Sequence, residues 1–131
     1  MIDIEADIFD YVYPSVAPLV PEGCFKSVYV PAPPALPFAT LIEMENVTDS
    51  LFQTSSGLDE HAIITYEANV YAEEKFECKE IMSVIDTALR AINFKRVSLQ
   101  FVPNLADNTL FRYTARFRAS VNPQKTVYRT N

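Results

Sequence analysis

The sequence predicts an α+β fold, with a mainly antiparallel sheet, a long central helix packed on one face and the element order αβββαββ. The first observation is the segment 110–121, where apolar and polar side chains alternate with the two-residue period of a strand. The second is the segment 73–93, whose apolar side chains recur at helical spacing. The third is the segment 61–72, which also alternates. A helix with one apolar stripe can seal one face of the sheet that such strands form.

Two elements are expected before the first long strand. The segment 2–13 has apolar residues at helical spacing and acidic residues in its first turn, so it predicts a helix that ends at Pro14. The chain is then rich in proline, with six prolines between positions 14 and 34. Such a segment runs extended over a surface, and only a short strand, Phe25–Val30, is expected within it.

The next two strands are expected to form a hairpin. Phe38–Val47 and His61–Ala72 have the composition of strands, and the even-numbered side chains of the second are apolar, which assigns them to the core. The segment between them, Thr48–Glu60, is rich in Ser, Thr and Asp. It is longer than an ordinary hairpin turn, which is typical of a functional or disordered loop.

The second half of the chain supplies the central helix and two more strands. Glu73–Asn93 carries one continuous apolar stripe, made of Cys78, Ile81, Met82, Ile85, Leu89 and Ile92. Arg96–Val102 is predicted to be a strand with three inward-facing apolar residues, namely Val97, Leu99 and Phe101. The segment 110–121 is then the final strand and is expected to leave a long edge exposed. Residues 1–121 are expected to form a single α+β domain, and residues 122–131 a polar C-terminal tail.

Composition and charge limit the classes of function. A chain of 131 residues with 49% hydrophobic and 21% charged residues is typical of one soluble globular domain, and no apolar run reaches the roughly 20 residues of a membrane helix. Residues 1–90 hold 16 acidic and 4 basic side chains, whereas residues 91–131 hold 1 and 7. These halves either neutralise each other within one fold or meet between copies of the chain. The net charge of −6 disfavours a dedicated DNA-binding module.

The residue types needed for catalysis and metal binding are scarce. Cys24 with His61 is the one Cys/His combination worth testing, and neither lies in a known nucleophile motif. Two buried thiols are the simpler interpretation of Cys24 and Cys78. Asp59 and Glu60 beside His61 could hold a weakly bound cation, although a solvated charge cluster is the simpler interpretation. We therefore expect no enzyme, no cofactor and no metal site.

The polar face of the predicted sheet carries charges of both signs. Glu43 and Glu45 lie two residues apart, so they are expected on one face of their strand, and Glu67 follows on the next strand. One interpretation of these carboxylates is an acid/base pair, and the favoured one is salt bridges to the arginines of the last strand. The candidates for subunit-interface contacts are Glu43, Glu45, Glu67, Arg112, Arg116 and Arg118.

Contacts with partners are also expected from the segments that a core supports poorly. The loop 48–60 and the tail 122–131 are polar and extended, and segments of this kind commonly become ordered on a partner. Within the loop, the candidates for partner contacts are Thr48, Asp49, Phe52, Ser55, Ser56, Gly57 and Asp59.

Besides the predicted order of the elements, the sequence contains several short characteristic segments. These are Ala-Leu-Pro-Phe-Ala-Thr-Leu-Ile at 35–42, Thr-Ser-Ser-Gly at 54–57, and the final strand 112–121 with its Arg-Phe-Arg ending. Together they resemble the tail terminator proteins of long-tailed bacteriophages, also called tail completion or head-to-tail joining proteins. The resemblance covers about residues 2–121 and departs from the family in the proline-rich segment 14–34.

The resemblance implies a small α+β subunit that forms a ring, usually a hexamer, and caps the finished tail tube. Its partners would be further copies of itself, the tail tube protein and a head-completion or connector protein, with no membrane. DNA would pass through the lumen without specific binding. The protein would reside at the tail and neck junction of the virion, and in the bacterial host cytoplasm during assembly. The alternatives are another head–tail junction or minor tail component, and a small non-viral ligand- or protein-binding α+β domain.

Overall fold

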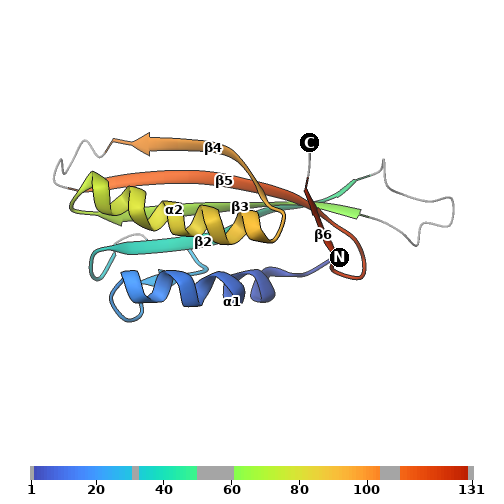
Figure 1. Ribbon diagram of the computed structural model, residues 1–131, viewed down its shortest axis with the longest axis horizontal. Coiled ribbons are helices and arrows are strands. Elements are labelled where there is room, and N and C mark those ends of the chain that lie inside the picture. The colour runs from blue at the N-terminus through green and yellow to red at the C-terminus, as the bar shows by residue number, and fades with distance from the viewer. Residues whose placement is uncertain (1, 31–32, 50–60, 104–109, 130–131) are drawn as a thin grey trace, which may run out of the picture.

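A computed structural model describes residues 2–30, 33–49, 61–103 and 110–129 of the chain (Figure 1). Its elements are α1 (Glu5–Val16), the 3-10 helix η1 (Ala17–Leu19), β1 (Phe25–Lys26), β2 (Phe38–Asp49), β3 (His61–Ala72), α2 (Lys75–Ala91), β4 (Lys95–Val102), β5 (Phe111–Val121) and β6 (Val127–Arg129). Some of the predicted contact residues lie outside the described residues, namely Phe52, Ser55, Ser56, Gly57 and Asp59.

The six strands that the structure describes belong to one sheet. The strand order is β1-β2-β3-β5-β4, and β6 pairs with the end of β5. β1 runs parallel to β2, whereas the other neighbouring strands are antiparallel. The fold is therefore α+β, as the sequence predicts, with a mixed sheet. The parallel pair arises because the chain between Lys26 and Phe38 returns to the same end of the sheet before β2 begins.

The core lies between the sheet and the two helices, on what we call the helix face. The even-numbered side chains of β3, from Ala62 to Ala72, are at most 4% exposed, and Phe117 opposite them on β5 is fully buried. α2 buries the stripe that the sequence predicts, apart from Ile92, which is partly exposed. α1 contacts α2 and adds buried residues, Val12 among them, to the same core. The apolar faces of the strands and of α2 therefore pack against each other, as the sequence predicts.

α1 is shifted relative to its predicted position. It begins at Glu5 and continues through Pro14 to Val16, so the prediction that Pro14 ends the helix is wrong. A proline removes one helical hydrogen bond. Val12 and Val16, on either side of it, are fully buried, and this packing holds the last turn in the helix. The strand predicted over 25–30 is confined to its first two residues, Phe25 and Lys26.

The arginine-bearing strand lies inside the sheet, contrary to the expectation of a long exposed edge. β5 pairs with β3 on one side and with β4 on the other. The sequence also does not predict β6, which lies within the expected tail 122–131 and pairs with β5. The Asn93 side chain fastens this segment, because its amide donates a hydrogen bond of 3.0 Å to the Val127 carbonyl oxygen. The long strand at the end of the sheet is β4.

The apolar residues of β4 are exposed, so the prediction that they belong to the core is wrong. Val97, Leu99 and Phe101 are between 40% and 43% exposed. Leu99 and Phe101 do point to the helix face, since they lie opposite Ala115 and Tyr113 of β5. A helix is about 10 Å wide and strands are about 4.8 Å apart, so one helix covers about two strands. α2 packs mainly on β3 and β5 and leaves β4 largely uncovered.

Candidate functional site

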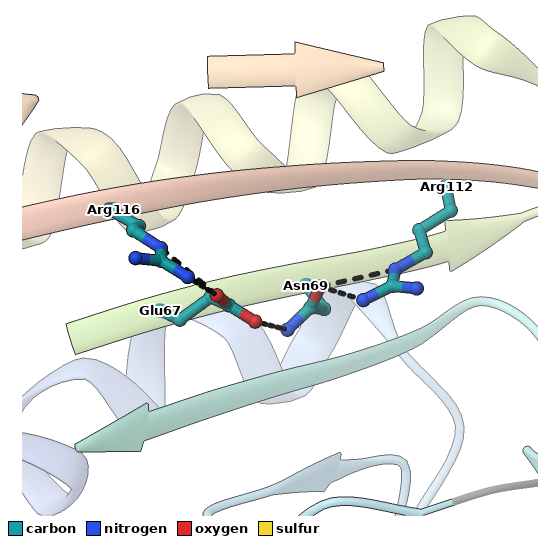
Figure 2. A network of polar contacts seen from close by, with 4 residues as sticks. All are labelled: Glu67, Asn69, Arg112 and Arg116. Carbon is teal, nitrogen blue, oxygen red and sulfur yellow. Dashed lines mark hydrogen bonds and ion pairs between the residues drawn. The ribbon is translucent and has the colours of Figure 1, made fainter. Parts of the chain in front are cut away.

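Four polar side chains form a continuous network on the face of the sheet opposite the helices, which we call the outer face (Figure 2). The Arg116 guanidinium lies 3.2 Å from a carboxylate oxygen of Glu67. The Asn69 amide donates a hydrogen bond of 3.1 Å to the other carboxylate oxygen of Glu67. The Asn69 oxygen in turn accepts two hydrogen bonds from Arg112, at 2.8 and 3.2 Å. One asparagine therefore links two arginines through one carboxylate.

The strand register creates this network. Glu67 lies directly opposite Arg116, and Tyr71 lies directly opposite Arg112. The Arg112 guanidinium also lies over the Tyr71 ring, 5.3 Å from its centre. Because Asn69 is only 3% exposed, it is fixed in position and orients its charged neighbours. The salt bridge predicted for Glu67 is present, and it lies within one subunit. A cross-strand pair of opposite charge contributes roughly 0.2–1 kcal/mol to the stability of a sheet.

β5 carries three arginines on its outer face, and Arg118 is the one that does not belong to the network. It lies opposite Thr65 on β3 and opposite Lys95 on β4. It forms no ion pair with any residue that the structure describes. Two like charges directly opposite each other on neighbouring strands are destabilising. The Arg118–Lys95 pair therefore places uncompensated positive charge on the outer face, beside the β4 edge.

Glu43 and Glu45 lie on different faces of the sheet, so the prediction that they share one face is wrong. A β-bulge at Met44 inserts one residue between them. Glu43 consequently lies opposite Tyr66 on the helix face, and Glu45 opposite Thr65 on the outer face. A spacing of two places side chains on one face only in a regular strand. The three carboxylates considered as an acid/base group are therefore divided between the two faces.

Glu43 is partly buried on the helix face, near the carboxylates of Glu5 and Asp3 and the hydroxyl of Tyr66. Burial raises the pKa of its carboxyl group above the ordinary value of 4.5, and the carboxylates of Glu5 and Asp3 raise it further. The Tyr66 hydroxyl is near enough to offset part of this shift, and burial raises the pKa of that phenol in turn. No hydrogen bond of ordinary geometry joins Glu43 Oε1 or the Tyr66 hydroxyl to a described residue. The site therefore favours the neutral form of Glu43.

Glu43→Gln is expected to stabilise the protein at neutral pH. Since the pKa is raised in the folded state, the proton is bound more tightly there than in the unfolded chain. The resulting stability is fully present below the ordinary pKa and is lost as the pH rises through the folded-state pKa. Glutamine cannot ionise, so thermal unfolding should show a higher midpoint than wild type near pH 7 and no advantage near pH 4.

The matched control for this variant is Glu45→Gln. Glu45 is exposed on the same strand, and its replacement should give no gain that depends on pH. A Glu43→Gln protein that unfolds at a lower temperature than wild type near pH 7 would show that Glu43 is not in the environment described above.

The residues considered for nucleophilic chemistry are far apart. The Cys24 carbonyl oxygen accepts a hydrogen bond from the Ala39 amide near the start of β2, whereas His61 pairs with Asp49 at its end. Ten strand residues correspond to roughly 30 Å, so Cys24 and His61 are too far apart to act as a nucleophile and its base. Burial raises the pKa of the Cys78 thiol to about 11, which keeps it protonated and unreactive at neutral pH.

Within the described residues, no group of three or more His, Cys, Asp or Glu side chains is placed to hold a metal ion. Among the helices of the described part of the chain, none has the length and apolar character needed to cross a membrane. Of the suggested cation site, Asp59 and Glu60 lie outside the described residues.

A second surface, which the sequence analysis misses, lies along β4. We call it the β4 patch and define it as Leu99 and Phe101 of β4 together with Lys75 and Lys79 of α2, which lie beside them on the helix face. The Lys75 ammonium lies over the Phe101 ring, 4.9 Å from its centre. Lys79 and Leu99 line a shallow hollow of about 230 Å³ between α2 and β4. The sequence does contain a sign of this surface, because it predicts more long strands than the apolar stripe of one helix can cover.

The sequence matches no protein-family model and no curated protein. Among solved structures, a matching chain comes from a structure described as the virion of a native gene transfer agent particle. The alignment covers 86% of this chain and 92% of that chain, with a TM-score of 0.58 and 17% sequence identity. The two chains share a fold. The agreement extends over most of both chains, so it concerns the whole α+β arrangement and not one motif.

Proposed function

We propose that this protein is a structural component of a virion and acts as a ring-forming tail terminator. The observation that carries the proposal is the fold shared with a chain of a gene transfer agent virion over most of both lengths. The assignment to a tail terminator is supported by the element order and the short segments at 35–42, 54–57 and 112–121, which resemble that family.

In this role, copies of the chain form a ring, most simply a hexamer, on the end of the completed tail tube. The ring stops addition of further tube subunits and presents its other side to the head-completion or connector protein. DNA passes through its lumen, and the net charge of −6 suits a channel that must not retain DNA. The proposal assigns the protein no reaction and no cofactor.

The outer face supplies the first candidate contacts for assembly. The predicted interface residues that lie on it are Glu45, Glu67, Arg112, Arg116 and Arg118, whereas Glu43 faces the helices and is left out. The network around Asn69 holds two of the arginines in fixed positions, so little side-chain entropy is lost when a partner binds them. The predicted loop 48–60 between β2 and β3 is the candidate for contact with the tube or the connector.

The location of the protein on the tail tube tests this function directly. The chain, carrying an affinity label, is to be co-expressed with the tail tube protein of the same genome and viewed by electron microscopy. A tail terminator should label one end of each tube and should shorten the tubes as its amount increases. Label distributed along the tubes would exclude a terminator, and label only on heads would favour a different junction component.

Arg118→Glu is expected to fold normally and to assemble poorly. The new carboxylate would face Lys95 across the strands and replace a repulsive pair, so the fold should gain roughly 0.2–1 kcal/mol. Assembly should weaken because an anion replaces the unpaired cation beside the β4 edge. Sedimentation velocity checks the association, and circular dichroism checks the fold.

Arg116→Glu serves as the comparison for this variant. It also reverses the charge of one arginine of β5, but it breaks the ion pair with Glu67 and should lose fold stability as well. If Arg118→Glu forms rings at the same concentration as the wild type, the arginines of β5 do not lie at the subunit junction.

A further inference from the structure

The sheet and the layer of helices above it are out of step within one subunit. One helix covers about two strands, because a helix is about 10 Å wide and neighbouring strands are about 4.8 Å apart. α2 packs mainly on β3 and β5, and α1 packs against α2 on the side where β2 lies, as Figure 1 shows. α1 can therefore cover β2 and one further strand position beyond it, whereas β4 is left largely uncovered at the other end of the sheet.

The strand position beyond β2 is filled only at one end by the described residues. β1 occupies it for two residues, Phe25 and Lys26, and β2 has no described strand on this side from Leu41 onward. Phe25 stacks on Phe9 of α1 with 4.8 Å between the ring centres, so this position does lie under α1. A hollow of about 420 Å³ adjoins it, lined by α1 and by Ser27, the residue that follows β1.

β4 has the edge and the side chains that this position can accept. It pairs with β5 on one side only among the described strands, so the N–H and C=O groups of its other edge can bind a partner strand. Leu99 and Phe101 are 43% and 40% exposed on the helix face, where a second helix would bury them. We propose that β4 of one copy pairs with the free edge of β2 of the next copy, beneath the α1 of that copy. The sheet then continues from subunit to subunit, an inference that rests on the proposed ring.

The strand directions and the free length of β2 agree with this pairing. β4 runs opposite to β2 within one subunit, because each step from β2 through β3 and β5 to β4 is antiparallel. Rotation about a ring axis that runs along the strands preserves direction, so β4 and the β2 of the next copy are antiparallel. Paired residues must also share a face of the sheet. The register that uses the whole free edge places Phe101 opposite Leu41, on the helix face, and Gln100 opposite Ile42, on the outer face.

This register is displaced along the strands from the register within the subunit. Gln100 lies level with Thr40 of its own sheet, because Gln100 pairs with Thr114, Thr114 with Asn69, and Asn69 with Thr40. At the junction Gln100 instead meets Ile42, two residues further along β2. A sheet that closes on itself needs such a stagger, since its strands tilt relative to the axis. The block that β1 places on the start of β2 is therefore compatible with ring closure.

The charges of the two edges are complementary on the outer face. β4 carries basic and no acidic residues, whereas β2 carries acidic and no basic residues. Lys95 and Glu45 both lie on the outer face, and neither forms an ion pair with a described residue. In the register above they are diagonal neighbours across the junction, which is within reach of a long side chain. On the helix face Arg96 already binds Asp86 at 3.2 Å, so only the outer-face pair contributes.

A disulfide across the junction tests this pairing. In Gln100→Cys/Ile42→Cys the two cysteines lie opposite each other on adjacent copies, where the Cα atoms of an antiparallel pair are about 4.5–5.5 Å apart, as a disulfide requires. Within one subunit they are at least three strand spacings apart, roughly 14 Å, so they cannot join each other. Oxidation of the assembled variant should give a ladder of covalent multimers on a denaturing gel, which ends at the number of copies in the ring.

The controls separate this register from other contacts. Gln100→Cys/Val47→Cys keeps the second cysteine exposed on the outer face of β2 but moves it five residues along the strand, and it should give no ladder. The wild type, whose two cysteines Cys24 and Cys78 are buried, sets the background. Gln100→Cys alone should give no covalent multimers. Covalent dimers of this single variant would show that β4 pairs with β4, which would overturn the inference.

Leu99→Lys gives a second readout that needs no disulfide. Leu99 is exposed in a single subunit, so the variant should remain folded by circular dichroism. In the ring its charge would be buried beneath the α1 of the next copy, so the variant should stay monomeric at concentrations at which the wild type forms rings. Thr87→Lys adds the same charge to an exposed position of α2 and should assemble like the wild type.

Native mass spectrometry of the same samples separates this inference from the proposed function. Rings that form without the disulfide ladder, or rings of Leu99→Lys, would overturn the pairing of β4 with β2 and leave the proposed function standing. A wild type that forms no rings, together with a cysteine variant that gives no ladder, would overturn both.

Discussion

Phe117→Ala is expected to lower the free energy of unfolding by about 3–5 kcal/mol. Phe117 is fully buried at the centre of the helix face, directly opposite Tyr66. The Tyr66 ring packs edge-on against Phe94 at 5.5 Å, so removal of the Phe117 ring leaves a cavity beside an aromatic pair that cannot readily move to fill it. Domains of this size are stable by about 5–15 kcal/mol, so the loss is a large share of the total. Urea denaturation measures it.

Phe76→Ala is the matched control for this change. Phe76 is 72% exposed on α2, so the same substitution there should alter the free energy of unfolding by no more than about 0.5 kcal/mol. A loss of less than about 1 kcal/mol for Phe117→Ala would mean that β5 does not turn its apolar side toward the helices.

Ile85→Ala is expected to cost about 2–5 kcal/mol. Ile85 is the fully buried midpoint of the α2 stripe, where the helix covers β3 and β5. Alanine is an excellent helix former, so the loss would come from the cavity and not from the helix itself. Urea denaturation again gives the change in free energy, and the slope of the transition should be unchanged if the variant still unfolds in two states.

Thr87→Ala provides the comparison on the same helix. Thr87 is exposed, and its replacement should raise stability by a few tenths of a kcal/mol through helix propensity alone. Equal effects of Ile85→Ala and Thr87→Ala would show that α2 does not seal the sheet.

The elements with a strong period were predicted well from the sequence. β3 has its predicted bounds, and α2 differs from its prediction by two residues at each end. In both, the side-chain pattern alone decides which face is buried, because a period of 2 or 3.6 leaves no second way to hide the apolar residues. The same reasoning assigned the buried side of β5 correctly.

The elements that depend on their neighbours were not predictable in this way. β4 has the pattern of a half-buried strand, but its place at the end of the sheet, beyond the reach of α2, exposes it. The bulge at Met44 places Glu43 and Glu45 on opposite faces of the sheet. The bulged residue is neither glycine nor proline, so the local sequence gives no sign of the bulge. β6 is three residues long, too short for a period to be recognised. In each case tertiary packing decides the outcome and the local sequence does not.

The charged network could be predicted in part. The alternation of β3 and β5 brings Glu67 and Arg116 to the same face, and the register places them opposite each other. Asn69 was missed as the link to Arg112, although it lies on the same side of β3 as Glu67, two residues away. A buried asparagine between charged residues on one strand face is the signal that would have identified it.

The measurement that tests the central claim most directly is the mass and shape of the purified wild-type protein at neutral pH over a wide range of concentrations. Native mass spectrometry together with electron microscopy should show one closed ring with a central channel, built from a fixed number of identical copies. A protein that stays monomeric at every concentration, with β4 still exposed, would contradict the proposed assembly.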